Sequence, residues 1–252
     1  MKKIALITGA TSGIGKAIAQ ILASNGYDLI ITGRREELLN HLSESIKKET
    51  EAEVMTLCFD VRDLNQVEKA IDSLTGKWKN IDLLINNAGL AVGLEPVYSG
   101  VVDDWDRMID TNVKGLLYVS RRVSPGMVAR ESGHIINLAS IAGHEAYANG
   151  AAYCASKHAV LAITKAMRIE LLPFGVKVSA ISPGMVDTEF STVRFKGDKE
   201  RADNVYTGLT PLYALDIAET VLFMVNRPKH VNIDEIVIMP TDQASARDYR
   251  RR

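Results

Sequence analysis

The segment KIALITGATSGIG, residues 3–15, decides the fold of this 252-residue chain. Its opening run, KIALIT, has the short apolar pattern of a buried β-strand. Glycines follow at positions 9, 13 and 15, and a helical pattern then runs from Ile14 to Asn25-Gly26, a pair typical of a helix end. The segment therefore predicts a strand, a tight glycine-rich turn and a helix in direct succession.

Short apolar runs and longer helical patterns alternate in the same way along the rest of the chain. Strands are predicted at residues 3–8, 28–32, 53–58, 81–86, 134–138, 176–181 and 235–238. Helices are predicted at 14–25, 35–49, 63–75, 104–130, 151–172 and 214–226. Strands that are apolar on both faces and separated by helices indicate a parallel sheet covered on both sides. The prediction is one α/β domain over residues 1–252, a three-layer, Rossmann-type doubly wound fold with a seven-stranded parallel sheet.

Residues 185–212 form the longest stretch without a clear period. A segment of this size inside a compact domain is usually functional or mobile. We therefore expect the substrate loop at residues 185–212.

The glycine-rich turn at Thr8–Gly15 lies where a phosphate-binding loop is expected. Glycines allow a tight turn and a close approach of a pyrophosphate, and the helix N-terminus supplies free N–H groups. The spacing is G-x-x-x-G-x-G rather than the general G-x-G-x-x-G. An ordinary tight turn is the alternative, but the position after the first strand favours a dinucleotide cofactor.

The end of the second strand indicates which dinucleotide is bound. An acidic residue there usually binds the ribose of NAD, whereas an arginine accommodates the 2′-phosphate of NADP. This chain has Thr32-Gly33-Arg34-Arg35, with no carboxylate at the tip. Arg34 and Arg35 therefore predict NADP, because guanidinium groups form charge-assisted hydrogen bonds with phosphate. The alternative is that both arginines are solvated residues at the start of a helix.

Composition argues against several other classes of protein. A net charge of −1 gives no electrostatic reason to expect nucleic acid or an anionic membrane as a partner. No run approaches the roughly 18 apolar residues of a membrane span. The five histidines and two cysteines lack metal-ligand spacing, so no metal site is expected. Two cysteines cannot build a disulfide framework, which favours a reducing compartment, the cytoplasm.

Tyr153 and Lys157 are four residues apart within a predicted helix, so their side chains share one face. A nearby ammonium favours a phenolate, so we expect Lys157 to lower the pKa of Tyr153 and make it a general acid and base. The alternative for this pair alone is a surface tyrosine packed over a lysine stem.

Together these segments resemble the short-chain dehydrogenase/reductase superfamily in its single-domain form. The motifs that carry the resemblance occur in the family's order along the whole chain. They are TGATSGIG at 8–15, DV at 60–61, NNAG at 86–89, the Asn of TNV at 112, the Ser of LAS at 140, YCASK at 153–157 and PGMVDT at 183–188.

The resemblance implies a role for each matching residue. It implies that Tyr153 is the acid and base, that Lys157 holds the nicotinamide ribose, that Ser140 binds the substrate oxygen and that Asn112 anchors a water relay. Taken singly, Ser140 and Asn112 have the alternative of helix or turn caps. The cofactor residues that the resemblance implies are Gly9, Ser12, Gly13, Ile14, Gly15, Asp60, Val61, Asn87, Ala88, Gly89, Pro183, Gly184, Val186 and Thr188. Many NADP-using members have a basic residue where this chain has Ser12, so the NADP prediction depends on Arg34 and Arg35.

Several loops look like the branch of this superfamily that acts on 3-hydroxy acids. They are NNAGLAVGLEP at 86–96, DWDRMIDTN at 104–112, GHIIN at 133–137 and the segment from Thr188 to Asp198. The resemblance implies serine, allo-threonine, 3-hydroxyisobutyrate or 3-hydroxypropionate as substrate. Arg194 and Lys196 are candidates for the substrate carboxylate, and Glu95 for a substrate ammonium, because buried charges must be paired. The alternative for this loop is a solvated lid of mixed charge.

Two other functions remain open from the sequence. One is a reductase of a 3-ketoacyl group or a bulky ketone, for which an apolar loop is expected in place of Arg194 and Lys196. The other is a non-catalytic nucleotide sensor, for which damage to the catalytic residues is expected. The superfamily resemblance also implies a homotetramer, and apolar residues on helices 104–130 and 151–172 fit a second buried face. These residues are Leu116, Leu117, Val119, Val160, Leu161 and Ile163.

Overall fold

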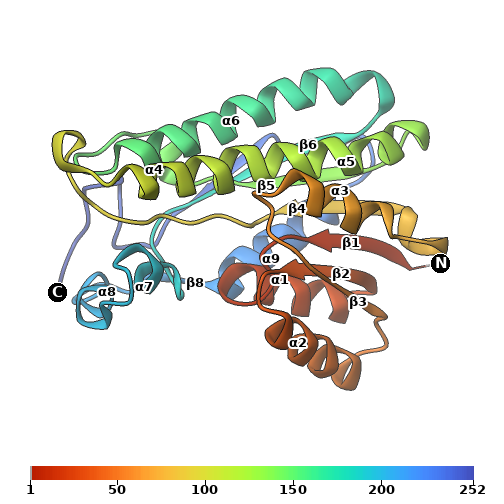
Figure 1. Ribbon diagram of the computed structural model, residues 1–252, viewed down its shortest axis with the longest axis horizontal. Coiled ribbons are helices and arrows are strands. Elements are labelled where there is room, and N and C mark those ends of the chain that lie inside the picture. The colour runs from red at the N-terminus through yellow and green to blue at the C-terminus, as the bar shows by residue number, and fades with distance from the viewer. Residues whose placement is uncertain (1) are drawn as a thin grey trace.

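A seven-stranded parallel sheet lies at the centre of the molecule (Figure 1). The computed structural model describes residues 2–252. The strand order is β3-β2-β1-β4-β5-β6-β9 and every neighbouring pair is parallel, which confirms the predicted sheet. The strands are β1 Lys3–Ile7, β2 Tyr27–Gly33, β3 Val54–Cys58, β4 Ile81–Asn86, β5 His134–Leu138, β6 Lys177–Pro183 and β9 Glu235–Ile238.

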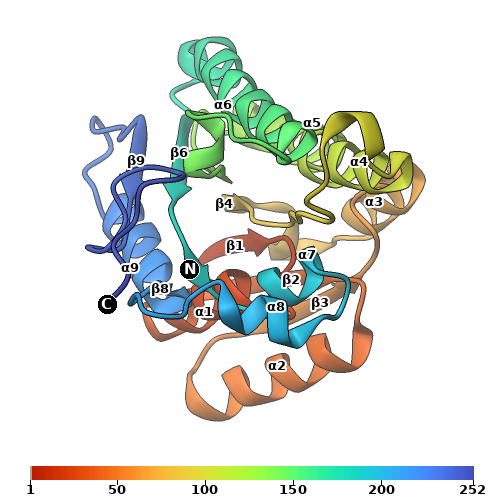
Figure 2. The ribbon, with the colours of Figure 1, turned by 90° about the vertical axis from the view of Figure 1, so that its left-hand side faces the viewer.

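Helices cover both faces of this sheet (Figure 2). On one face, Ile18 and Leu22 belong to the core that α1, α2 and α9 form with the strands. On the other face, Val119 and Val123 belong to the core beneath α3, α5 and α6. The helices are α1 Gly13–Ser24, α2 Glu36–Glu49, α3 Leu64–Asp72, α4 Val102–Ile109, α5 Leu116–Ala129, α6 Ala151–Leu171 and α9 Ala214–Val225. The predicted three layers are therefore confirmed.

The chain changes direction across the sheet at β1, which lies between β2 and β4. Open α/β sheets bind ligands at such a switch point, beyond the carboxyl ends of the strands. Thr8 follows β1, and its hydroxyl accepts hydrogen bonds from the backbone N–H groups of Asn87 and Ala88 at 3.0 and 2.9 Å. These bonds hold the glycine-rich turn beside the segment that follows β4.

The predicted helix 104–130 is present as one continuous helical run from Val102 to Ala129, with a π-helical turn inside it. α4 ends at Ile109, a π-helical turn spans Asp110–Gly115, and α5 begins at Leu116. Buried Asn112 lies in this turn and hydrogen-bonds both backbone groups of Leu90 at 2.8 Å. π turns are often found at functional sites, and this one directs Asn112 towards the segment after β4.

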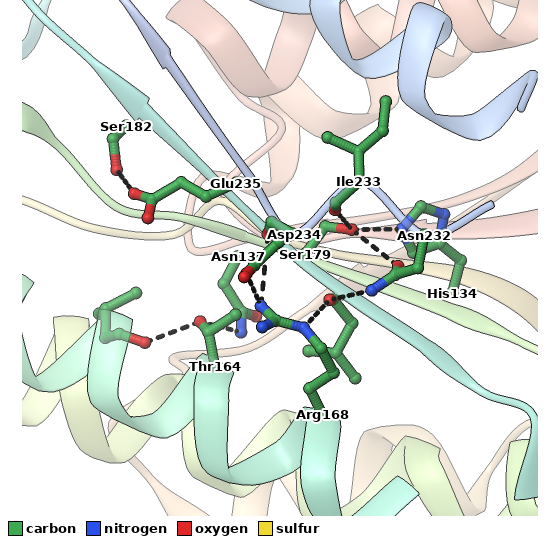
Figure 3. Close-up of polar contacts among 12 residues, drawn as sticks. His134, Asn137, Thr164, Arg168, Ser179, Ser182, Asn232, Ile233, Asp234 and Glu235 are labelled. Atoms are coloured by element: carbon green, nitrogen blue, oxygen red, sulfur yellow. Dashed lines mark hydrogen bonds and ion pairs between the residues drawn. The ribbon is translucent and has the colours of Figure 1, made fainter. Parts of the chain in front are cut away.

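The edge strand β9 is fastened to β6 by side chains as well as by the backbone ladder (Figure 3). The Ser179 hydroxyl donates to the Ile233 carbonyl, and the Ser182 hydroxyl donates to the Glu235 carboxylate, both at 2.6 Å. The other labelled members of this network are His134, Asn137, Thr164, Arg168, Asn232 and Asp234. These contacts fix β6, whose carboxyl end leads into the predicted cofactor residues Pro183 and Gly184.

The predicted loop 185–212 contains short elements. β7 Val186–Asp187 pairs in parallel with β8 Leu212–Tyr213, and the helices α7 Phe190–Arg194 and α8 Lys199–Asn204 lie between them. Five- and six-residue helices are too short to show a helical period in the sequence. The segment is therefore more ordered than its sequence pattern suggests.

The apolar residues expected to form a second buried face are mostly inside the single chain. Leu116, Val119, Val160 and Leu161 are buried in the core of one molecule, so the interpretation of these four is wrong. A wide core face accounts for them. Leu117 and Ile163 retain exposed surface.

Candidate active site

The glycine-rich turn has the shape that a pyrophosphate requires. Gly9 and Gly13 have φ angles of +67° and +51°, in the left-handed region that favours glycine. A Cβ on Gly15 would overlap the Gly9 carbonyl oxygen and lie 2.5 Å from Nδ2 of Asn87. A larger residue at Gly15 would thus push the turn away from β4. The N-terminus of α1 opens directly from this turn, so its free N–H groups face the cleft.

A cleft of about 380 Å³ runs along the carboxyl end of the sheet. Every predicted catalytic or cofactor residue lines it except Gly15, which lies behind the turn, and Asn112. The lining residues that the sequence predicts are Gly9, Ser12, Gly13, Ile14, Arg34, Arg35, Asp60, Val61, Asn87, Ala88, Gly89, Ser140, Tyr153, Lys157, Pro183, Gly184, Val186 and Thr188. Lining residues that sequence reasoning missed include Thr11, Phe59, Leu90, Arg107, Thr111 and Glu189. The fold brings these residues to the cleft. In the sequence, the only sign of this position is that they lie close to the recognised motifs.

Arg34 and Arg35 lie at one end of this cleft. The Arg35 guanidinium donates to the hydroxyls of Thr11 and Ser12, both at 2.9 Å, and forms an ion pair with Glu189 at 3.2 Å. Arg34 lies 3.7 Å from the Asp60 carboxylate. Two guanidinium groups beside the glycine-rich turn fit a phosphate-bearing cofactor.

Asp60 remains ionised beside these arginines. Burial raises its pKa, but hydrogen bonds from Arg62 outweigh burial and hold the pKa below the usual range. The Asp60 carboxylate is thus already bound by Arg62, at 2.6 Å. This pairing leaves Arg34 with only a long contact to Asp60.

Tyr153 and Lys157 lie one turn apart on α6, both buried in the wall of the cleft. Burial raises the pKa of Tyr153 to about 12, while the Arg194 guanidinium opposes this shift. Burial also lowers the pKa of Lys157 to about 8. The predicted lowering of the Tyr153 pKa by Lys157 is therefore not found, because burial dominates.

The distances explain why Arg194 has the stronger influence on Tyr153. Its Cζ lies 4.9 Å from the ring centre of Tyr153, whereas Nζ of Lys157 lies 5.9 Å from that centre. Lys157 instead donates a hydrogen bond to the Leu138 carbonyl at 2.8 Å. The Lys157 ammonium is thus bound to the backbone at the end of β5, and the Arg194 guanidinium lies against the tyrosine ring.

Ser140 and Asn112 complete the predicted catalytic set, and both also have structural partners. The Ser140 hydroxyl forms a hydrogen bond with Tyr153 and accepts one from the Ala142 N–H at 3.1 Å, so its alternative role as a cap is also present. The Asn112 amide donates to the Ser156 hydroxyl at 3.0 Å, in addition to its two bonds with Leu90. The water relay from Asn112 to Lys157 stays a prediction.

Arg194 lies beside Tyr153 as the substrate hypothesis requires. Its guanidinium also contacts the Phe190 ring, 5.3 Å from the centre, and donates to the Tyr147 hydroxyl at 3.0 Å. Nε of Arg194 is buried and has no hydrogen-bond partner within residues 2–252. A buried donor without a partner is costly, so this atom is available to an anion bound next to Tyr153. Sequence reasoning missed Tyr147.

The other two predicted substrate residues, Lys196 and Glu95, have contacts of their own. Nζ of Lys196 lies 2.7 Å from the Asp104 carboxylate, so its charge already has a partner, and its role as a carboxylate ligand stays a prediction. The Glu95 carboxylate accepts a hydrogen bond from the Leu94 N–H at 2.8 Å. Glu95 lines a small cavity together with Tyr153 and Arg194.

Residues 2–252 contain neither a cluster of metal ligands nor a membrane-spanning helix. Three or more metal-binding side chains do not gather at any point in this part of the chain. Within it, no helix has both the length and the apolar character to cross a membrane.

Comparisons with known proteins agree with this geometry. The model of the family described as short chain dehydrogenase matches residues 3–199. A Salmonella typhi protein named NADP-dependent 3-hydroxy acid dehydrogenase YdfG is 46% identical over 244 residues, which cover 96% of this chain and 97% of that protein. Sulfoacetaldehyde reductase 2 of Chromohalobacter salexigens is 42% identical over 245 residues, covering 97% and 96% of the two chains. Among solved structures, the closed form of serine dehydrogenase complexed with NADP⁺ superposes with a TM-score of 0.92 at 43% identity, covering 96% and 97% of the two chains.

Proposed function

Because this chain belongs to the short-chain dehydrogenase family, we propose that it transfers hydride between NADP(H) and a small 3-hydroxy acid or the matching 3-oxo acid or semialdehyde. The observation that carries the substrate class is the position of Arg194. Its guanidinium lies 4.9 Å from the ring centre of Tyr153, so an acid group bound by Arg194 would hold its neighbouring carbon atoms close to the tyrosine hydroxyl. The relatives named for 3-hydroxy acids and serine support this class.

The residues around the cleft fit NADP. The tight turn at Gly9 and Gly13 admits a pyrophosphate, and Arg34 and Arg35 supply donors for a 2′-phosphate. When bound, NADP(H) supplies the hydride chemistry, and the protein supplies orientation and proton transfer.

Tyr153 carries the proton step of the proposal. In the reducing direction its hydroxyl donates a proton to the substrate oxygen, and a pKa of about 12 keeps it protonated at neutral pH. Ser140 donates a hydrogen bond to the same oxygen and stabilises the charge that develops there. In the oxidising direction Tyr153 must first lose its proton, and the positive charge of Arg194 favours the phenolate.

The substrate end has a defined charge pattern. Nε of Arg194 has no partner within the described residues, and its donor can meet a carboxylate. Glu95 is the candidate for a substrate ammonium, since it lines the small cavity next to Arg194. A sulfonate has the same charge as a carboxylate, and the similarity to a sulfoacetaldehyde reductase makes a small sulfonated aldehyde the second candidate.

The remaining alternatives fit the geometry less well. A reductase of bulky ketones would need an apolar wall where Arg194 stands. A non-catalytic sensor would not need Ser140, Tyr153 and Lys157 together in one cleft.

We also propose a homotetramer in the cytoplasm. Leu117 remains 41% exposed on α5, and Ile169 and Leu172 are exposed at the end of α6, so apolar surface is available for contacts between chains. Cys58 and Cys154 are both free thiols, which suits a reducing compartment. Light scattering at micromolar concentration tests the assembly, and the mass of one chain would reject it.

Purified protein tests the proposed reaction directly. It should oxidise L-serine, allo-threonine, 3-hydroxyisobutyrate or 3-hydroxypropionate with NADP⁺ more efficiently than with NAD⁺, and reduce sulfoacetaldehyde if the second candidate holds. Tyr153→Phe should keep cofactor binding and lose roughly 10²–10⁴-fold in kcat, the usual contribution of an acid-base group. Preference for a bulky neutral alcohol would reject the substrate class, and near-normal turnover by Tyr153→Phe would reject the mechanism.

A further inference from the structure

Asp104 is a buried carboxylate on α4 that the sequence did not single out, and it lines the small cavity that also contains Glu95, Tyr153 and Arg194. It is 3% exposed, and its Oδ2 lies 2.7 Å from Nζ of Lys196. The contact is an ion pair by distance, although its geometry is not that of a hydrogen bond to Oδ2. The next cation, Arg107, is 3.9 Å from the other carboxylate oxygen. Because burial of a single charge is costly, Lys196 is the main compensation for Asp104.

Lys196 belongs to the turn that follows α7, so the ion pair joins two distant parts of the chain. Its backbone has a φ of +55°, in the left-handed region that non-glycine residues rarely adopt, and Gly197 follows with +95°. A turn of this kind persists where surrounding contacts hold it. The side chain of Lys196 is 49% exposed, so its pairing with Asp104 is the contact that directs it inwards.

A second contact links the same turn to the segment after β4. The Gly93 N–H donates to the backbone carbonyl of Arg194 at 3.0 Å. Gly93 has a φ of +73°, and a Cβ there would lie 2.9 Å from Oδ2 of Asp104. Asp104 therefore packs against Gly93, whose N–H binds the Arg194 carbonyl. It also pairs with Lys196, which follows Arg194 by two positions.

Arg194 is placed by these contacts. It precedes Lys196 by two positions, and its guanidinium lies over the Tyr153 ring while its backbone is held by Gly93. The Tyr147 hydroxyl holds one guanidinium nitrogen, at 3.0 Å. The left-handed backbone of Lys196 sets the direction of the chain after Arg194. Asp104 binds the Lys196 side chain and so holds that backbone conformation.

We propose that Asp104 is a positioning residue for substrate capture: by binding Lys196 it fixes the turn after α7 and holds the Arg194 guanidinium over Tyr153. The proposal rests on the proposed function, since it requires Arg194 to bind the acid group of the substrate. Asp104 touches neither substrate nor cofactor in this role. Lys196 acts as the anchor of the turn and not as a ligand.

Four variants test this assignment in steady-state kinetics with NADP⁺ and the best acidic substrate. Asp104→Asn and Lys196→Met should each raise KM for that substrate about tenfold, since a misplacement of about 1 Å can cost on the order of 100-fold in efficiency. In both variants kcat and KM for NADP⁺ should stay within about twofold, because Tyr153 and the cofactor residues are untouched. Lys196→Arg should restore KM, because it retains the charge. The double variant Asp104→Asn/Lys196→Met should be no worse than either single variant, because both act through one contact.

A control removes an exposed ion pair that lies away from the cleft. Glu68 of α3 pairs with Arg121 of α5 at 3.0 Å, and Glu68→Gln should leave both KM values unchanged. Thermal unfolding and NADP⁺ titration check that the Asp104 variant is folded. Lys196→Met replaces a half-exposed side chain and keeps the test valid if the Asp104 variant does not fold.

Each remaining outcome overturns the assignment in a distinct way. A raised KM in Lys196→Met with an unchanged KM in Asp104→Asn would make Lys196 a direct substrate ligand. A fall in kcat at constant KM would place Asp104 in the chemical step. Arg194→Ala is measured alongside: if it raises KM and the Asp104 and Lys196 variants do not, the positioning role fails while the proposed function stands. If Arg194→Ala also leaves KM unchanged, the proposed carboxylate site fails as well.

Discussion

Arg35 and Glu189 form an ion pair at 3.2 Å that joins the two walls of the cofactor cleft. Arg35 follows β2 at the nucleotide end, and Glu189 precedes α7 in the substrate segment. The carboxylate of Glu189 therefore occupies a guanidinium that we assign to the 2′-phosphate of NADP. Binding of the phosphate and this ion pair should compete.

Glu189→Gln should tighten NADP⁺ binding. The neutral amide competes less well for Arg35, and an exposed pair of this kind is worth at most about 1 kcal/mol, or roughly fivefold in Kd. Fluorescence titration measures the Kd, with NAD⁺ and the exposed Glu200→Gln of α8 as controls that should not change. Weaker NADP⁺ binding by Glu189→Gln would show that Glu189 orients Arg35 for the phosphate.

Replacement of Arg34 and Arg35 by alanine should shift the preference from NADP⁺ towards NAD⁺. Each lost charge-assisted contact should cost about 1.5–3 kcal/mol in kcat/KM for NADP⁺. Arg35 also binds Thr11 and Ser12, so Arg35→Ala alone should disturb the glycine-rich turn and lower kcat/KM for both cofactors. Arg34→Ala should lower kcat/KM for NADP⁺ only. Arg227→Ala, at the exposed end of α9, is the control. An unchanged NADP⁺/NAD⁺ ratio in the double variant would place the phosphate elsewhere.

The parts of this protein that were predictable are those in which neighbouring residues decide the outcome. The hydrophobic period of the sequence and local geometry predict the strand at 3–8 and the turn at Gly9. They also predict that Tyr153 and Lys157 share one face of a helix. The pKa of Tyr153 did not follow, because it depends on burial and on Arg194, which approaches from a segment far away in the sequence. Nor did the contact between Lys196 and Asp104, which only the tertiary fold brings together.

Lys157→Met should make the protein more stable at neutral pH and abolish turnover. Burial lowers the folded-state pKa of Lys157 from its ordinary value of 10.5 to about 8, so the unfolded chain binds more protons between these values. The free energy of unfolding should therefore rise with pH from about 8 to about 10, by up to about 1 kcal/mol per unit. The raised pKa of Tyr153 acts in the opposite direction, but only above about 10.

Urea unfolding at pH 7, 8, 9 and 10 measures this effect. The slope with pH should be smaller in Lys157→Met than in the parent protein. Lys165→Met, at an exposed position of the same helix, should keep the parent slope. Parallel curves for all three proteins would show that Lys157 carries its charge in the folded state without cost.

Arg194→Ala should weaken capture of acidic substrates and displace the pH profile. If the substrate carboxylate is desolvated, loss of its partner should cost roughly 2–5 kcal/mol in kcat/KM, with a much smaller loss for a neutral alcohol. Arg194 also lowers the pKa of Tyr153 against the effect of burial. Without it the pKa should rise further, so alcohol oxidation should need a higher pH.

The pH dependence of kcat for oxidation measures this displacement. Arg201→Ala removes a guanidinium that stacks on Phe195 in the same segment, and this control should leave the profile unchanged. Equal losses for charged and neutral substrates, with no displacement of the profile, would make Arg194 a residue that only orders the loop.

The π-helical turn at Asp110–Gly115 keeps the buried side chains of α4 and those of α5 on the same side of the helix. One row of buried residues has intervals of four, at Asp104, Met108, Asn112 and Leu116, with Thr111 and Gly115 buried beside it. At about 100° per residue, a straight α-helix would rotate such a row by about 40° at each step, or about 120° over three steps. One additional residue in the turn compensates for about 100° of that drift. The length of this segment is therefore as constrained as its composition: deletion of one residue there would rotate α4 against α5 and carry either Asp104 away from the turn after α7 or Val119 out of the core.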